Sequence, residues 1–197
     1  MKSNVHLLFP TPIYRTNIGV DYPDNESLEF EESNNGFISV NQQYLPTNLI
    51  LKKTIEKEID NFLYKELLLS SKISVKHQCS WVLLHQKGNH SPRHYHANSW
   101  LSGIYYITVS EKSGKLRFAD AVPYGWTSGN VVPDVEKRNN INSSSWEFLP
   151  VCGDLFLFPS HINHCSDINE TNEDRICISF NYTLEGEWGT STAFIKT

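Results

Sequence analysis

The feature that most constrains the fold is a series of short apolar and aromatic segments separated by glycine, proline, asparagine and serine. Such segments are typical of β-strands, because β-branched and aromatic side chains fit a pleated, half-buried surface. No regular alternation with helices accompanies them, which favours antiparallel pairing. The segments span residues 79–85, 101–109, 115–119, 146–151, 154–159 and 175–184. They predict a mainly β chain folded as an antiparallel sandwich or barrel.

One segment, residues 45–69, has helical periodicity instead. Its apolar residues recur at the spacing of one helix face, at Ile55, Ile59, Phe62, Leu63 and Leu67. Thr47 is placed to cap the first turn through its side-chain oxygen. The pattern predicts a supporting helix on the N-terminal side of the strands.

Residues 120–145 interrupt the rhythm of the strands with proline, glycine, asparagine and serine. An irregular segment of this length is usually either functional or disordered. Tyr124 and Trp126 suggest a loop that covers a substrate, although Trp126 would equally serve to pin the loop to the core.

Length and charge limit the classes of protein that this chain represents. Its 197 residues suit a single domain spanning 1–197. The net charge of -5 and the lack of a lysine and arginine cluster argue against a nucleic-acid partner. No apolar run approaches the roughly 18 residues of a membrane span, and the short apolar run near the N-terminus does not suit a signal peptide. The four scattered cysteines predict reduced thiols in a cytoplasmic protein.

Two histidines, His94 and His96, stand just before the apolar strand 101–109. Side chains two residues apart leave a strand on the same face, so both imidazoles can reach one metal ion while Tyr95 points away. The pair alone is weak evidence, because histidines at this spacing also occur on surfaces or hydrogen-bonded in a core.

A second segment strengthens the metal hypothesis. His161 and His164 follow the strand 154–159, and Arg175 opens the last strand beside Ile176. An arginine at the start of an apolar strand is costly to bury without an anion, and its planar guanidinium suits a carboxylate.

These motifs together resemble the Fe(II)- and 2-oxoglutarate-dependent oxygenases. The resemblance rests on "LFPTPIY" (8–14), "HYHANSWLSGIYY" (94–106) and "RICISFN" (175–181), together with the strand "DLFLFPS" and the histidine that follows it. It is similar to a family of small members with an HxHxNSxLSGxYY block and an RISISFN-type ending. The resemblance implies a double-stranded β-helix, a jelly-roll barrel with the metal at its open end.

The resemblance also implies roles for individual residues. His94, His96 and His164 would hold Fe(II) and act in catalysis through it. Arg175 would bind the far carboxylate of 2-oxoglutarate, assisted by Tyr106 and, on the same strand face, Ser102. Tyr106 is also compatible with a plain core position.

The sequence departs from the larger superfamily at His96, where an aspartate or glutamate is usual. Either three imidazoles hold the iron, or His94 and His164 do so with water completing the shell. We interpret His161, His85 and His90 as structural or solvent-exposed.

The implied activity is hydroxylation of an amino-acid, peptide or small-metabolite substrate, with release of succinate and CO2. Halogenation, desaturation and ring closure are alternative outcomes. A cupin-like metal enzyme that does not use 2-oxoglutarate and a non-catalytic jelly-roll binding protein are the competing hypotheses. The sequence indicates neither the substrate nor the oligomeric state.

Overall fold

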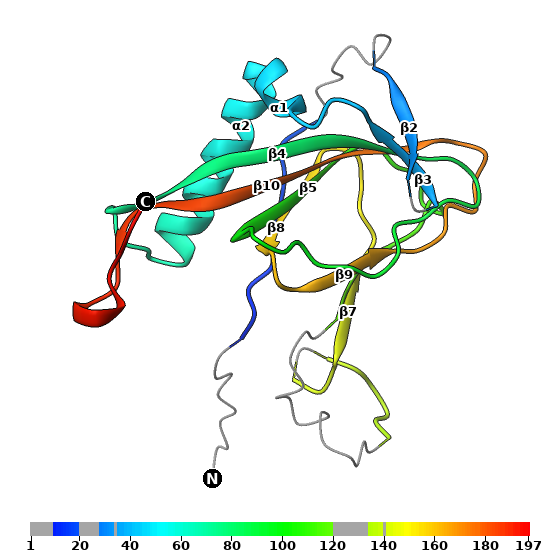
Figure 1. The fold of residues 1–197 in the computed structure, drawn as a ribbon. Coiled ribbons are helices and arrows are strands. Elements are labelled where there is room, and N and C mark those ends of the chain that lie inside the picture. The colour runs from blue at the N-terminus through cyan, green and yellow to red at the C-terminus, as the bar shows by residue number, and fades with distance from the viewer. Residues whose placement is uncertain (1–9, 20–27, 34, 120–133, 140) are drawn as a thin grey trace.

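A computed structural model describes residues 10–19, 28–33, 35–119, 134–139 and 141–197. Two sheets of antiparallel strands form the body of the protein, with the helices on the outer face of the larger sheet (Figure 1). The larger sheet contains, in order, β1 (Tyr14–Asn17), β8 (Asp154–Pro159), β5 (Leu101–Thr108), β10 (Arg175–Trp188), β4 (Ile73–His85), β3 (Gly36–Ser39) and β2 (Phe30–Ser33), with β11 (Ile195–Lys196) paired to β10. The smaller sheet contains β7 (Ser145–Phe148), β6 (Leu116–Ala119) and β9 (Asn163–Ser166).

The central strands of the larger sheet are buried on both faces, and alternate residues serve different cores. On β5, Tyr105 and Ile107 belong to the core beneath the helices. Ile104 and Tyr106 belong to a second core that faces the smaller sheet. Seven of the eight residues of β5 are buried, which explains why its sequence is a nearly continuous apolar run.

The predicted helix is present but divided. It consists of α1 (Tyr44–Thr47), α2 (Leu49–Asp60) and η1 (Asn61–Glu66), the last of which is π-helical. The apolar face is confirmed, since Ile55, Ile59, Phe62 and Leu63 are almost fully buried. A positive φ of 52° at Leu68 marks the turn that follows the helix.

The predicted cap at Thr47 is wrong. The Thr47 hydroxyl donates to the carbonyl of Tyr44 in the preceding turn. Asn48 caps α2 instead, because its Oδ1 accepts a hydrogen bond of 3.1 Å from the backbone N–H of Leu51.

All six predicted strands are present, although the ends of most of them differ from the predicted limits. The structure adds β1, β2, β3, β9 and β11, and it extends β4 and β10 well beyond the predicted limits. Most of the predicted loop lies outside the described residues, including Tyr124 and Trp126. Within the described part of the chain, no helix is long and apolar enough to cross a membrane. The single domain over 1–197 stays a prediction.

Gly103 tests the contact between central strands β5, β8 and β10. A Cβ atom at this position would lie 2.3 Å from the Phe180 ring and 2.9 Å from Leu157 Cδ2. Both neighbours are fully buried, so overpacking should cost Gly103→Ala about 1–3 kcal/mol of unfolding free energy. Urea denaturation measures the effect. An unchanged unfolding free energy would mean that the ring moves aside without cost.

Candidate metal centre

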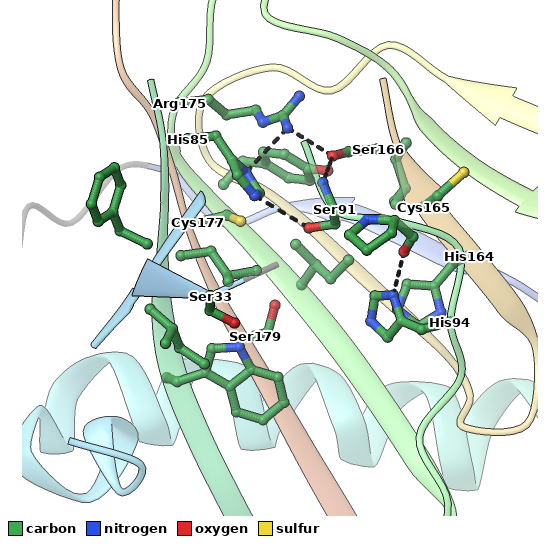
Figure 2. A pocket seen from close by; sticks show the side chains of 18 of the residues that line it. Ser33, His85, Ser91, His94, His164, Cys165, Ser166, Arg175, Cys177 and Ser179 are labelled. Atoms are coloured by element: carbon green, nitrogen blue, oxygen red, sulfur yellow. Dashed lines mark hydrogen bonds between the residues drawn. The ribbon is translucent and has the colours of Figure 1, made fainter. Parts of the chain in front are cut away.

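A cavity of about 290 Å³ opens on the inner face of the larger sheet, beside β9 (Figure 2). Inward-facing residues of β4, β5 and β10 form its floor. Its lining includes His85, His94, His96 and His164, Arg175, Tyr106 and Cys177, four serines, and a set of apolar side chains. Among the described residues that line it, none is an aspartate or glutamate.

A backbone bridge brings His94 and His164 together although they are far apart in the sequence. The N–H of each residue donates to the carbonyl of the other, at 3.0 and 2.9 Å. His164 is on β9, so this bridge attaches the segment around His94 to the edge of the smaller sheet. The imidazole centroids of the two histidines are 4.3 Å apart.

His96 is held in place by separate contacts. Its backbone N–H donates to the carbonyl of Ser160 at 3.0 Å. Its Nδ1 lies 3.3 Å from the side-chain nitrogen of Asn181, and its ring lies beside Trp81. Tyr95, between the two histidines, is 57% exposed, as expected if it points away from the site.

The structure therefore brings together the three histidines named from the sequence. One ring nitrogen from each of His94, His96 and His164 lies within 4.8 Å of the other two. His94 and His164 each have Nδ1 hydrogen-bonded to a backbone carbonyl, of Pro92 and Ile162 respectively. Those carbonyls require a proton on Nδ1, which leaves the Nε2 lone pair free for a metal ion.

Burial keeps two of these imidazoles neutral. Desolvation, followed by the nearby charge of His94, lowers the pKa of His96 to about 4. The same two causes lower the pKa of His164 to about 3, against a smaller opposing effect of the Ile162 carbonyl. Neutral imidazole is the form that binds metal. The donor set fits a first-row transition metal such as iron, for which imidazole is a suitable ligand.

Arg175 lies in the part of the cavity away from His94 and His164 and is 1% exposed (Figure 2). One terminal nitrogen, Nη1, donates to the backbone carbonyls of Ser113 and Asp167. The other, Nη2, contacts Ser166 Oγ at 2.7 Å and His85 Nδ1 at 3.1 Å. All four contacts are neutral acceptors, so no described side chain balances this buried charge. Burying a cation in this way is costly, and an anion entering the cavity would offset the cost.

His85 is the main site residue that the sequence analysis missed. It is 3% exposed and bridges Arg175 and Ser91, whose Oγ is 3.3 Å from His85 Nε2. The sequence did hold one signal. His85 follows Trp81 and Leu83 at two-residue spacing, so the three side chains lie on the same face of β4. That face becomes informative only once the pairing of β4 with β10 is known, because this pairing sets His85 opposite Arg175.

Tyr106 and Ser102 differ in their positions, although both lie on the inner face of β5. Tyr106 lines the cavity, and burial raises the pKa of its phenol. The structure does not place Ser102 on the cavity. The Ser102 hydroxyl lies 2.8 Å from Ser160 Oγ and 2.7 Å from Asn181 Oδ1, so its polar contacts are within the protein.

The other two histidines that the sequence analysis named, His161 and His90, are outside the cavity lining. His161 is exposed and His90 is half-buried.

The pKa of His85 makes a prediction about stability and pH. Desolvation, then the charge of Arg175, lowers this pKa from 6.5 to about 3. Below pH 6.5 the unfolded chain therefore gains a proton that the folded protein does not. The unfolding free energy should fall as the pH drops from 6.5 towards 3, by about 1.4 kcal/mol per pH unit from this residue. Urea denaturation of the wild type and His85→Gln between pH 7 and pH 5 measures the difference in slope. Equal slopes for the wild type and His85→Gln would contradict the assigned environment of His85.

The comparisons with known proteins agree with this geometry. A family profile described as "Putative 2OG-Fe(II) oxygenase" matches residues 79–181, the segment from β4 to β10 that contains the three histidines and Arg175. A search of curated proteins gave no match.

Several solved structures share the fold. An oxidoreductase of the 2OG-Fe(II) oxygenase family from Burkholderia pseudomallei is 11% identical, with a TM-score of 0.55 over 81% of this chain and 73% of the other. A prolyl-4-hydroxylase from Pseudomonas putida is 12% identical, with a TM-score of 0.52 over 88% and 92% of the chains. HygX from Streptomyces hygroscopicus, solved with nickel, 2-oxoglutarate and hygromycin B, is 12% identical, with a TM-score of 0.55 over 88% and 83%.

At this level of identity the structural matches establish the fold, which is the predicted double-stranded β-helix. The family profile covers more than half of the chain and implies an oxidoreductase that uses Fe(II) and 2-oxoglutarate. This chain belongs to the family of 2OG-Fe(II) oxygenases that the profile describes.

Proposed function

We propose that the protein is an Fe(II)- and 2-oxoglutarate-dependent dioxygenase that hydroxylates a small-molecule or peptide substrate. The reaction would consume 2-oxoglutarate, O2 and the substrate C–H bond, and it would yield succinate, CO2 and the hydroxylated product. One observation carries the proposal. A single cavity joins three clustered histidines to a buried arginine that has no carboxylate partner among the described residues.

Arg175 would bind the far carboxylate of 2-oxoglutarate. Its Nη1 is occupied by two backbone carbonyls, which fix the orientation of the guanidinium. Its Nη2 is on the side of Ser166 and His85, and both of these residues line the cavity. The incoming carboxylate would compete with these neutral acceptors for Nη2 and gain a charged partner. The Tyr106 hydroxyl, which has no hydrogen-bond partner among the described residues, would supply a further donor.

His94, His96 and His164 would hold the iron through Nε2. Bound Fe(II) would supply the redox chemistry that couples O2 reduction to decarboxylation and substrate oxidation. The cavity provides no carboxylate ligand among its described residues, so an all-imidazole site would carry one more positive charge than a two-histidine, one-carboxylate site. This charge favours a dianionic co-substrate.

The substrate would bind along the wall formed by Trp81, Phe37, Ile38 and Leu83. The polar groups near this wall include the indole N–H of Trp81 and the hydroxyls of Ser33 and Ser179. We therefore expect the part of the substrate that lies against this wall to be uncharged, since a charged group would be desolvated there without a partner. The cytoplasmic location stays a prediction.

The experiment is anaerobic loading with Fe(II) and 2-oxoglutarate, followed by O2 and measurement of succinate across a panel of amino acids, peptides and metabolites. Substrate-stimulated succinate release with one equivalent of hydroxylated product supports the proposal. Iron binding without any conversion of 2-oxoglutarate would favour a metal enzyme of another type. Failure to bind iron at all would indicate a non-catalytic role.

Substitution of the histidines tests the metal site. His94→Ala and His164→Ala should each abolish stoichiometric Fe(II) binding, because each removes one ligand from a small set. His96→Ala should cause a milder loss, since water can complete a two-histidine shell. Anaerobic equilibrium dialysis with iron analysis measures binding, and circular dichroism checks the fold. His161→Ala is the control, because this neighbouring histidine is exposed and outside the cavity. Wild-type iron affinity in His94→Ala or His164→Ala would remove that residue from the site.

Substitution of Arg175 tests the co-substrate site. Loss of one partner of a buried ion pair typically costs about 3–5 kcal/mol, so Arg175→Ala should weaken 2-oxoglutarate binding by roughly two to three orders of magnitude. Arg175→Lys keeps the charge without the planar fork and should be intermediate. Iron affinity should hardly change. Anaerobic titration of the Fe(II) protein, followed by its metal-to-ligand charge-transfer band, measures the affinity.

The matched control is Arg117→Ala. Arg117 is an arginine of β6 that forms ion pairs with Glu147 and Asp167 and does not line the cavity. The Arg117→Ala variant should therefore bind 2-oxoglutarate with the wild-type affinity in this titration. An unchanged titration in Arg175→Ala would refute the co-substrate assignment even if the histidines bind iron.

A further inference from the structure

Four polar residues around Arg175 form a closed circuit of hydrogen bonds (Figure 2). Arg175 Nη2 lies 3.1 Å from His85 Nδ1 and 2.7 Å from Ser166 Oγ. His85 Nε2 lies 3.3 Å from Ser91 Oγ. The backbone N–H of Ser91 donates to Ser166 Oγ at 2.8 Å, which closes the circuit. All four residues line the cavity.

The arginine fixes the direction of the hydrogen bonds on the side of His85. A guanidinium has N–H donors and no acceptor, so His85 Nδ1 must accept from Arg175 Nη2. Burial, followed by the charge of Arg175, lowers the pKa of His85 to about 3. The imidazole is therefore neutral, and its single proton is on Nε2, from which it donates to Ser91 Oγ. It follows that the Ser91 hydroxyl does not donate to His85 and keeps its own proton for another acceptor.

The Ser166 hydroxyl is a donor for a similar reason. Its oxygen accepts from Arg175 Nη2 and from the backbone N–H of Ser91, and these two bonds use both lone pairs. Among the described residues, none accepts a hydrogen bond from the hydroxyl of Ser91 or of Ser166. The circuit thus leaves two O–H donors on the cavity lining, beside a buried cation.

Two glycines show how tightly the circuit is enclosed. A Cβ atom at Gly36 would lie 2.6 Å from His85 Cδ2, and a Cβ atom at Gly114 would lie 2.6 Å from Arg175 Nη1. The backbone at both glycines therefore packs directly against these side chains and leaves them no room to move in that direction. Donors that are fixed before a ligand arrives lose little conformational entropy when they bind it.

We propose that Ser91 and Ser166 bind the far carboxylate of 2-oxoglutarate by donating their hydroxyl protons to it, and that His85 is the positioning residue that keeps Ser91 a donor. This inference rests on the proposed function and adds these three residues to it. An ionised carboxylate only accepts hydrogen bonds, so it matches a site that presents O–H and N–H donors. Hydrogen bonds to an ionised group are also stronger than those between neutral groups.

The test compares two ligands on the Fe(II)-loaded protein under anaerobic conditions. 2-Oxovalerate has the same carbon chain as 2-oxoglutarate, with a methyl group in place of the far carboxylate. Ser91→Ala should weaken 2-oxoglutarate binding about 10- to 100-fold, the usual effect of losing one hydrogen bond to a charged group. Binding of 2-oxovalerate should hardly change, because it offers Ser91 no acceptor. Titration of the metal-to-ligand charge-transfer band measures both affinities.

Two further serine variants complete the comparison. Ser166→Ala should weaken 2-oxoglutarate binding at least as much as Ser91→Ala, because it removes a donor and also the acceptor that closes the circuit. Ser74→Ala is the matched control, since Ser74 is a serine of β4 whose hydroxyl donates to the carbonyl of Glu185 and which does not line the cavity. This control should bind both ligands as the wild type does. Fe(II) affinity should stay at the wild-type value in all three variants.

Two results would overturn the proposal. One is wild-type affinity for 2-oxoglutarate in Ser91→Ala. The other is an equal loss of affinity for 2-oxoglutarate and 2-oxovalerate, which would show a merely structural effect. A wild-type protein that binds iron but not 2-oxoglutarate would refute the proposed function, and this inference with it, so the two failures are distinguishable.

A measurement on the metal-free wild-type protein tests the circuit without any serine variant. Long-range proton–nitrogen-15 correlation spectra report which ring nitrogen of a histidine carries the proton, and His85→Gln assigns the signal. We expect His85 to carry its proton on Nε2 at neutral pH. A proton on Nδ1 would contradict the proposal, because the Ser91 hydroxyl would then donate to His85.

Discussion

Side chains on β10 alternate between two buried faces, and the candidate site depends on this alternation. Ile178 and Phe180 pack beneath the helices. Arg175, Cys177 and Ser179 line the cavity on the other face, with Asn181 next along the same face. A shift of one residue in the pairing of β10 would exchange these faces and bury polar groups in the helix-side core. The apolar face therefore holds the polar face in register.

The two neighbours of β10 complete the cavity floor, and their side chains alternate between the two faces of the sheet in the same way. β4 contributes Trp81, Leu83 and His85 from alternate positions, and β5 contributes Ile104 and Tyr106. The floor is thus made of paired strands, with a register shift between β10 and β5 at Ile176 and Cys177. Only the segment that carries His94 and His96 is irregular, and backbone hydrogen bonds to His164 and Ser160 attach it to the rest. Regular strands position side chains more precisely than loops do, which suits the proposed binding of a metal ion at the histidines and of a carboxylate at Arg175.

The central strands and the helix were predictable because their patterns are strong. The apolar runs of β5 and β8 and the spacing from Ile55 to Leu63 are visible without any partner. The cap at Asn48 was missed because Thr47 and Asn48 are both good capping residues, and only the path of the chain decides between them. Strands β1, β2 and β3 carry few apolar residues, and their pairing partners define them more than their sequence does.

The candidate site was predictable where short motifs mark its residues, and it was not predictable where a residue matters only because of its neighbour across a strand pair. Its motifs named the three histidines that the structure brings together, and Arg175 does lie in the same cavity. His85 escaped notice because its importance comes from its position opposite Arg175 across a strand pair. Ser102 was placed on the correct face of β5, yet period-two counting cannot tell whether a side chain reaches a cavity or meets a buried partner such as Asn181.

The bridge between His94 and His164 joins segments that are distant along the chain, so the three-histidine cluster exists only after both sheets have assembled. A metal ion bound by His94 and His164 would act as a removable cross-link between these segments. It would oppose the chain entropy gained on unfolding, as a covalent link between distant residues does. Its binding free energy would then add to the stability of the fold by mass action. The lifetime of this protein against proteases would follow the supply of its metal, independently of whether any substrate is present.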